Sequence, residues 1–185
     1  MVPTLQHGER LIVRKIAYTP DNGDIVIVKS KAFQKYIVKR VIALPGQEMS
    51  FDAGKKVVVD GVAIDEPYIS ELQVDIGNLY TYPVKIPQKG EKAEIGVIIA
   101  ERAVNPNKVY VSMDNGKIMV KGSSFVEDGE FVANKTTYKQ DGYFVMGDNR
   151  NGSSDSRRYG IVPKDEIVGK AVIRFAPLSA FGSIK

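Results

Sequence analysis

The sequence contains no cysteine and no tryptophan, and it has a single histidine, His7. Without cysteine there is neither a disulfide framework nor a thiolate zinc site. One imidazole leaves carboxylates as the remaining metal ligands, and these show no recognisable spacing, so we expect no metal and no cofactor. A Ser-His-Asp enzyme would depend wholly on His7, which lies in a short turn and is more simply interpreted as solvated.

Long hydrophobic runs and a strong charge bias are also missing. No apolar segment approaches the roughly 18 residues that cross a bilayer, and no secretory leader is visible, so we expect the 185 residues alone to be soluble. The net charge of +4 is compatible with an anionic membrane surface. It is too weak and scattered to indicate nucleic-acid binding. Glycine-rich phosphate loops do not occur.

The apolar segments that are present are rich in Val, Ile and Tyr, which predicts a mainly β protein with very little helix. Two hairpins are expected to turn at Asp60-Gly61 and Asn115-Gly116. A hint of a helical turn occurs at 163–168. Strands are expected near residues 10–18, 25–30 and 36–46, and again from residue 142. Two apolar blocks therefore flank a more polar stretch, which predicts a core of 1–46 plus 142–185 and an inserted β-rich subdomain of 47–141.

The strand at 36–46, YIVKRVIALPG, is apolar except for Lys39 and Arg40. Burial on both faces would make two adjacent cations costly. One interpretation is that one cation reaches water while the other pairs with a carboxylate. The other is that a lysine is desolvated so that it can be neutral and act as a base. The strand alone leaves both open.

Residues 147–160, GDNRNGSSDSRRYG, contain no aliphatic side chain and follow directly on an apolar strand. Composition alone is typical of a solvated loop. The position instead indicates polar groups held at the end of a core strand. Asp155 and Arg157 would share one side of an extended chain, and Ser153, Ser154 or Ser156 could hydrogen-bond a neighbouring ammonium group.

Four segments taken together, MVPTL (1–5), GDIVIV (23–28), 36–46 and 146–160, resemble the successive sequence boxes of bacterial type I signal peptidases. The tail RFAPLSAFG (174–182) is similar to the C-terminal end of Gram-positive members. The order and spacing of these segments match the family in residues 1–46 and 142–185, whereas residues 47–141 match it only in general character. The resemblance implies an antiparallel β-sheet catalytic core of the signal-peptidase type.

The resemblance also implies a serine–lysine dyad, with Lys39 as the general base. The family's nucleophilic serine precedes the Met of the first box, so it is expected immediately before Met1 and outside the 185 residues, which alone are expected to be inactive. The supporting residues fall on Ser153, expected near the lysine, and on Asp155 and Arg157, expected to hold the local structure.

The chemistry agrees with this assignment of Lys39. A base at neutral pH needs a pKa near 7–8 instead of about 10.4, a difference of about 4 kcal/mol. Burial among the apolar neighbours could supply this by desolvation; these are Ile37, Val38, Val41 and Ile42. Arg40 is expected to point to the opposite face, as an outward neighbour, and a guanidinium cannot give up its proton.

The substrates and setting follow from the resemblance. The family cleaves secretory preproteins after Ala-x-Ala-like segments bound in extended form. Candidate walls of shallow apolar pockets are Met1, Leu5, Ile37 and Val38, although each could equally be a core residue. Pro3 and Thr4 would shape the turn that presents the nucleophile. The 185 residues would be the extracytoplasmic part of a membrane-anchored protein, with an apolar catalytic surface against the bilayer.

Two other functions remain open. A non-catalytic relative could act as an assembly or chaperone factor for surface proteins, but such a protein has no need of a desolvated base. A self-cleaving repressor domain would share the dyad chemistry, but the polar insertion and the missing DNA-binding segment disfavour it.

Overall fold

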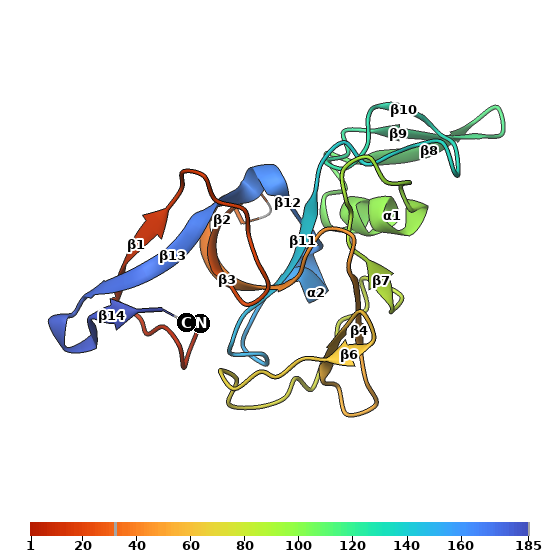
Figure 1. Ribbon diagram of the computed structural model, residues 1–185. Coiled ribbons are helices and arrows are strands. Elements are labelled where there is room, and N and C mark those ends of the chain that lie inside the picture. The colour runs from red at the N-terminus through yellow and green to blue at the C-terminus, as the bar shows by residue number, and fades with distance from the viewer. Residues whose placement is uncertain (32, 185) are drawn as a thin grey trace.

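The computed structural model describes residues 1–31 and 33–184, and in these residues the protein is built mainly from antiparallel β-sheet (Figure 1). The regular α-helix in the described residues consists of α1 (Ile95–Val104) and the single turn α2 (Ser156–Tyr159). The prediction of a mainly β fold with very little helix is therefore confirmed.

The largest sheet has seven strands and is built from the two ends of the chain. Its order is β1-β13-β2-β3-β11-β12, with β14 pairing on β13, and its neighbours are antiparallel. The strands are β1 (Arg10–Arg14), β2 (Ile25–Ser30), β3 (Lys35–Ala43), β11 (Gly142–Met146), β12 (Val162–Pro163), β13 (Ile167–Ala176) and β14 (Gly182–Ser183).

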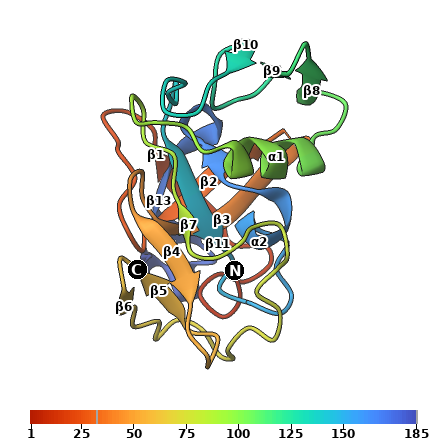
Figure 2. The same ribbon diagram turned by 90° about the vertical axis from the view of Figure 1, so that its right-hand side faces the viewer.

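Two smaller antiparallel sheets come from the middle of the chain. Figure 2 shows the β8–β10 sheet and α1 above β11, and the sheet that contains β4 below it. The strand orders are β6-β5-β4-β7 and β10-β9-β8. The strands are β4 (Glu48–Phe51), β5 (Val57–Val59), β6 (Val62–Ala63), β7 (Val84–Lys85), β8 (Tyr110–Asp114), β9 (Lys117–Lys121) and β10 (Gly129–Phe131).

Both predicted hairpins are present, and their turns explain the residues found there. Asp60 and Gly61 have φ of 51° and 80°, and Asn115 and Gly116 have φ of 47° and 78°. Two-residue hairpin turns with positive φ at both positions match the twist of the strands, and Asn, Asp and Gly adopt this conformation most readily. The short loops thus fix the pairing of β5 with β6 and of β8 with β9.

Several element boundaries differ from the sequence-based expectation. The strand expected over 10–18 ends at Arg14, and the helical turn expected at 163–168 is a short 3₁₀ turn at Lys164–Glu166. Helix α1 lies in a stretch for which no helix was predicted. It is only ten residues long, has Gly96 in its first turn and has no side-chain cap at Glu94, so its sequence signal is weak.

The hydrophobic core crosses from the main sheet to the two small sheets. One cluster joins Ile42 of β3 and Phe144 of β11 to Met49 of β4, Ile98 of α1 and Val120 of β9. A second cluster contains Val41 of β3 and Val145 of β11, at positions that alternate with Ile42 and Phe144, together with Val26 of β2. The division into 1–46 plus 142–185 and 47–141 stays a prediction, since the largest cluster contains residues of both parts.

In the part of the chain that the structure describes, no helix has the length and apolar composition that crossing a bilayer requires.

Phe144 provides a test of this shared core, because its side chain is fully buried where β11 meets the insertion. Phe144→Ala should lower the free energy of unfolding by about 3–5 kcal/mol, the cost of removing a large core side chain. Urea unfolding followed by far-UV circular dichroism measures this. Phe181→Ala, at a side chain that is 66% exposed, is the matched control and should change stability by less than about 0.5 kcal/mol. Equal losses of unfolding free energy in the two variants would contradict the assignment of Phe144 to the core.

Candidate active site

Lys39 lies in the middle of β3, and its ammonium group meets the loop that follows β11. Its Nζ donates a hydrogen bond to Ser153 Oγ at 2.7 Å. Gly147 faces the same contact: a Cβ there would lie 3.4 Å from Lys39 Nζ and would collide with Ser153 Oγ. The close approach of the two side chains therefore requires glycine at this position.

The surroundings of Lys39 favour its neutral amine. Burial lowers the pKa of Lys39 below that of an ordinary lysine, and the charge of Arg157 lowers it further. The carboxylates of Asp155 and Asp148 act in the opposite direction. Desolvation is the largest of these effects, so the net direction is downward.

The first five residues form a turn whose N-terminal end lies near Lys39. The turn is closed by the Leu5 N–H, which donates to the Met1 carbonyl at 2.9 Å. Thr4 Oγ1 donates to Asp148, and the Arg174 guanidinium donates to the Thr4 carbonyl at 3.2 Å. The pKa of the Met1 α-amino group is lowered by burial and by the charge of Lys39. The N-terminus is therefore within electrostatic reach of the lysine.

Arg40 is buried, and its prediction as an outward neighbour of Lys39 was wrong. Its side chain is 2% exposed and donates two hydrogen bonds to Asp148, at 2.9 and 2.8 Å. A third goes to the Gly23 carbonyl at 2.8 Å, and the guanidinium lies 3.8 Å from the centre of the Tyr68 ring. Side chains do alternate along β3, so Arg40 and Lys39 point to opposite faces of the strand. The face that holds Arg40 is covered by other residues as well. The partner carboxylate comes from far along the chain, so the local pattern did not reveal it.

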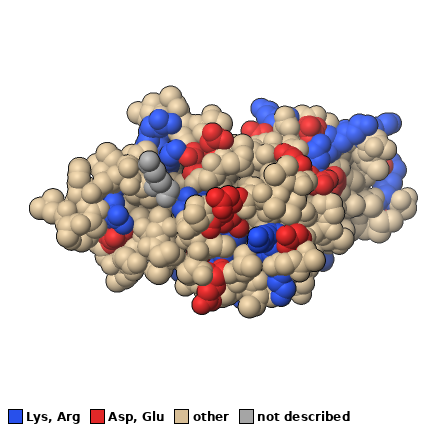
Figure 3. Space-filling model, turned by 60° about the horizontal axis from the view of Figure 1, so that its bottom comes forward, with Lys and Arg blue, Asp and Glu red and all other residues tan. Residues whose placement is uncertain are grey.

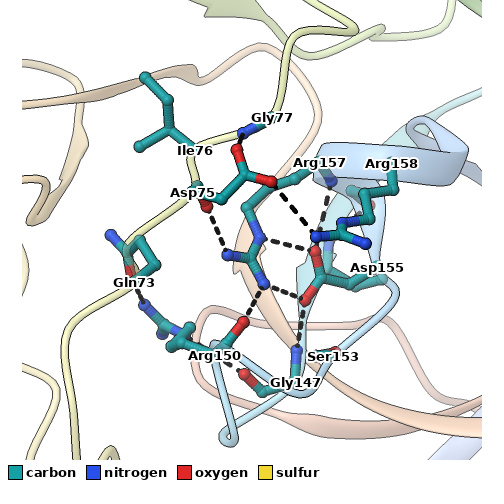
Figure 4. Close-up of polar contacts among 12 residues, drawn as sticks. Gln73, Asp75, Ile76, Gly77, Gly147, Arg150, Ser153, Asp155, Arg157 and Arg158 are labelled. Atoms are coloured by element: carbon teal, nitrogen blue, oxygen red, sulfur yellow. Dashed lines mark hydrogen bonds and ion pairs between the residues drawn. The ribbon is translucent and has the colours of Figure 1, made fainter.

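Asp155 and Arg157 form a second buried ion pair, shown in Figure 4. Arg157 donates to both carboxylate oxygens at 2.8 Å, and Asp155 also accepts from the Gly147 N–H at 3.1 Å. Asp155 caps α2 as well, by accepting from the Arg157 N–H. The pair thus ties the start of α2 to the backbone of Gly147, next to Lys39.

The three serines of this loop have different surroundings. Ser153 contacts Lys39, as described above. Ser156 is buried and accepts a hydrogen bond from the Val145 N–H at 2.9 Å, so it connects α2 to β11. Ser154 is exposed.

The four residues expected to line substrate pockets do not form one surface. Met1, Leu5 and Val38 pack together in a small cluster with Ile25 and Ala171. Ile37 instead packs against the cluster that contains Val26 and Val41. Leu5 is only 7% exposed, so it is the most buried of the four.

Sequence reasoning assigned no role to residues 66–77, yet they contact the loop that holds Ser153. Glu66 and Gln73 bind Arg150, and the Asp75 carbonyl accepts from Arg157 at 2.9 Å. Two adjacent acidic residues before a proline, Asp65 and Glu66, give no specific signal for such a role. Among residues 1–31 and 33–184, no group of three or more His, Asp or Glu side chains is arranged to hold a metal ion.

The Arg40–Asp148 pair predicts a large loss of stability when its charge balance is broken. Asp148→Asn should lower the free energy of unfolding by about 3 kcal/mol or more, because it leaves a buried guanidinium uncompensated. Asp165→Asn is the matched control, since Asp165 pairs with Lys31 at the surface and should lose less than about 1 kcal/mol. Urea unfolding measures both, and a loss in Asp148→Asn no larger than in the control would refute the structural importance of the buried pair.

Comparison with known proteins agrees with this geometry. The family model described as "Signal peptidase, peptidase S26" matches residues 1–176. A "Probable signal peptidase I-2" of Synechocystis sp. is 31% identical over 98% of this chain, and the chain spans 62% of that relative's length. "Signal peptidase IB" of Staphylococcus aureus is 30% identical over 98% of this chain and 75% of its own length.

Among solved structures, a signal peptidase I from Enterococcus faecalis V583 aligns with a TM-score of 0.42 and 20% identity, covering 83% of this chain and 97% of that one. The match of the family model over almost the whole length is the stronger result. This chain belongs to the signal peptidase family.

Proposed function

We propose that this chain is the catalytic part of a membrane-associated serine endopeptidase that removes signal peptides from secretory preproteins by a Ser–Lys dyad. The observation that carries the proposal is the surroundings of Lys39. Its amine is partly desolvated, has a lowered pKa and contacts a serine hydroxyl on a loop that buried ion pairs hold. A lysine with a lowered pKa is neutral at a lower pH than an ordinary lysine, and the neutral amine can take a proton.

The proposed nucleophile is a serine immediately before Met1. Support comes from the effect of the Lys39 charge on the pKa of the Met1 α-amino group, which indicates proximity. The turn that follows is held by Thr4 on Asp148 and by Arg174 on the Thr4 carbonyl. A residue on the amino side of Met1 would continue from this fixed turn.

In the proposed reaction, neutral Lys39 takes the proton of the nucleophilic serine as its oxygen attacks the scissile carbonyl carbon. The resulting ammonium group then gives that proton to the departing amine as the peptide bond breaks, which leaves an acyl-enzyme. Lys39 next takes a proton from water, whose oxygen attacks the ester carbonyl carbon. As the ester C–O bond breaks and releases the second product, the ammonium group returns the proton to the serine oxygen. The Ser153 hydroxyl accepts from Lys39 Nζ and orients it throughout.

The proposed substrate is an extended Ala-x-Ala-like segment. Strand β3 pairs with β2 along Lys35–Arg40, whereas its pairing with β11 begins at Arg40. In the described residues, the stretch 35–39 therefore has a ladder partner on one side only, and the open side suits an added peptide strand. Met1, Leu5 and Val38, which cluster beside this stretch, are proposed as apolar walls for small side chains. Ile37 is proposed as a further contact.

The proposed location is the extracytoplasmic face of a membrane. Leu178 and Phe181, in the turn between β13 and β14, are 85% and 66% exposed, and Ile12 and Phe175 are partly exposed on the strands nearby. Figure 3 shows few charged side chains at the left-hand tip of the molecule, where this turn lies in Figure 1. Exposed apolar side chains concentrated at one end are typical of a membrane or protein contact.

The position of the nucleophile can be tested by extending the chain. A chain that carries Gly-Ser before Met1 should cleave a peptide with an Ala-x-Ala site, while a chain that carries Gly-Ala, as the matched control, should not. The 185 residues without an extension should also be inert. A folded Gly-Ser chain without turnover would favour the non-catalytic relative. Turnover by the unextended chain would indicate Ser153, Ser154 or Ser156 as the nucleophile.

The role of Lys39 can be tested in the Gly-Ser chain. Lys39→Ala and Lys39→Arg should each lower kcat by about 10²-fold or more, because neither side chain can accept a proton. Lys29→Ala, at an exposed position of β2, should leave kcat unchanged. Circular dichroism checks that both variants are folded. Activity retained by either Lys39 variant would contradict the proposed role of Lys39 as the base.

The pH dependence follows from the direction of the pKa shift. Only the neutral amine acts as a base, so kcat/KM should rise with pH as Lys39 loses its proton. Because burial lowers the pKa, the rise should have its midpoint below the usual lysine value of about 10.4. A midpoint at or above that value would contradict the desolvation argument.

A further inference from the structure

Arg150 connects the loop of Ser153 to residues 66–77, far from Lys39 in the sequence. Its side chain is almost fully buried, and both terminal nitrogens donate to the Glu66 carboxylate, one of them at 2.9 Å. Gln73 Oε1 accepts a further hydrogen bond at 3.0 Å. The Glu66 side chain is itself only 5% exposed. The guanidinium is therefore held on one side by a buried carboxylate and a buried amide.

The other side of Arg150 faces the candidate active site, as Figure 4 shows. Its Nε donates to the Gly147 carbonyl at 3.3 Å. The Arg150 carbonyl accepts from Arg157 at 2.7 Å, and Arg157 in turn holds Asp155. Gly147 is the residue whose Cα faces the contact between Lys39 and Ser153. A continuous series of contacts thus leads from Glu66 through Arg150 to the backbone beneath the lysine amine.

Stability alone does not account for this ion pair. A buried pair costs desolvation energy on both partners, and apolar replacements of similar volume are often as stable. The Arg150 guanidinium makes a fourth hydrogen bond, from Nε to the Gly147 carbonyl, and this bond gives the ion pair a positioning role. An arginine fork fixed by a two-point contact holds its remaining donor in one orientation.

We propose that Glu66 is a positioning residue of the Ser–Lys site: by fixing Arg150, it fixes the Gly147 carbonyl and thereby the separation of Lys39 from Ser153. The kinetic consequence of this inference rests on the proposed function, whereas its structural consequence does not. Glu66 touches neither the reacting groups nor Lys39. Its carboxylate also accepts from the Tyr68 hydroxyl at 2.8 Å, but the contact that leads to Gly147 runs through Arg150.

The charged groups that act on the pKa of Lys39 belong to other elements: Asp155, Arg157 and Asp148. The Met1 α-amino group also faces the lysine, since the charge of Lys39 lowers its pKa. Two opposite effects of Glu66→Gln can therefore be distinguished. If Gly147 shifts and water reaches the amine, the pKa of Lys39 rises toward its ordinary value. If the unpaired Arg150 charge acts through space, the pKa falls.

The test measures the titration of Lys39 in the 185-residue chain labelled with ¹³C at lysine Cε, with the signal assigned by its loss in Lys39→Met. Glu66→Gln should raise the midpoint by about half a pH unit or more, and Glu66→Asp should raise it less. Glu130→Gln is the matched control, because Glu130 pairs with Lys117 at the surface, and it should leave the midpoint unchanged. An unchanged or lowered midpoint in Glu66→Gln would overturn the proposal. If Glu66→Gln does not fold, Glu66→Asp is used instead, and an unchanged or lowered midpoint in that variant would overturn the proposal.

A second measurement uses the Gly-Ser chain and the Ala-x-Ala peptide. Glu66→Gln should lower kcat about tenfold with KM changed less than twofold, since misplaced groups slow the chemical step more than they weaken binding. Equal kcat in Glu66→Gln and Glu130→Gln would overturn the proposal. If the parent Gly-Ser chain is inactive, the proposed function fails, and the titration of Lys39 still decides whether Glu66 positions it.

Discussion

The partial removal of the Lys39 amine from water is the constraint on which the surrounding structure depends. An ammonium group can be buried cheaply only if it becomes neutral or is paired, and the nearby carboxylates of Asp148 and Asp155 are each already paired with an arginine. Arg40 and Arg157 thus satisfy the acids that would otherwise hold the lysine in its charged form. The amine is left with a serine hydroxyl as its partner.

The buried ion pairs also explain why polar residues occupy the end of a core strand. Arg40 with Asp148, Arg150 with Glu66, and Arg157 with Asp155 surround the backbone at Gly147. Each arginine donates in addition to a backbone carbonyl. Fixed guanidinium groups of this kind keep a loop rigid where helix and sheet hydrogen bonds cannot. The loop that carries Ser153 is consequently held at several points along its backbone.

The local pattern of the sequence was sufficient to predict the strands and hairpins. It was insufficient to predict contacts between distant segments. Val, Ile and Tyr identify β3, and Asn115-Gly116 identifies the turn between β8 and β9, because both signals act within a few residues. Arg40 was expected to face outward, since its partner Asp148 lies more than a hundred residues away. Glu66 and α1 were missed for the same reason: tertiary packing, and not local propensity, determines their positions.

The main sheet is assembled from the two ends of the chain, and this has a consequence for folding. Lys39 and Ser153 are separated by 114 positions, and β1 pairs with β13 across an even longer interval. Contacts of such high sequence separation form late and slowly, because the intervening loop must be closed first. During synthesis the two side chains cannot meet until β11 and the loop after it have left the ribosome. Any peptidase activity of this chain therefore has to wait until the loop after β11 has been synthesised and can reach β3.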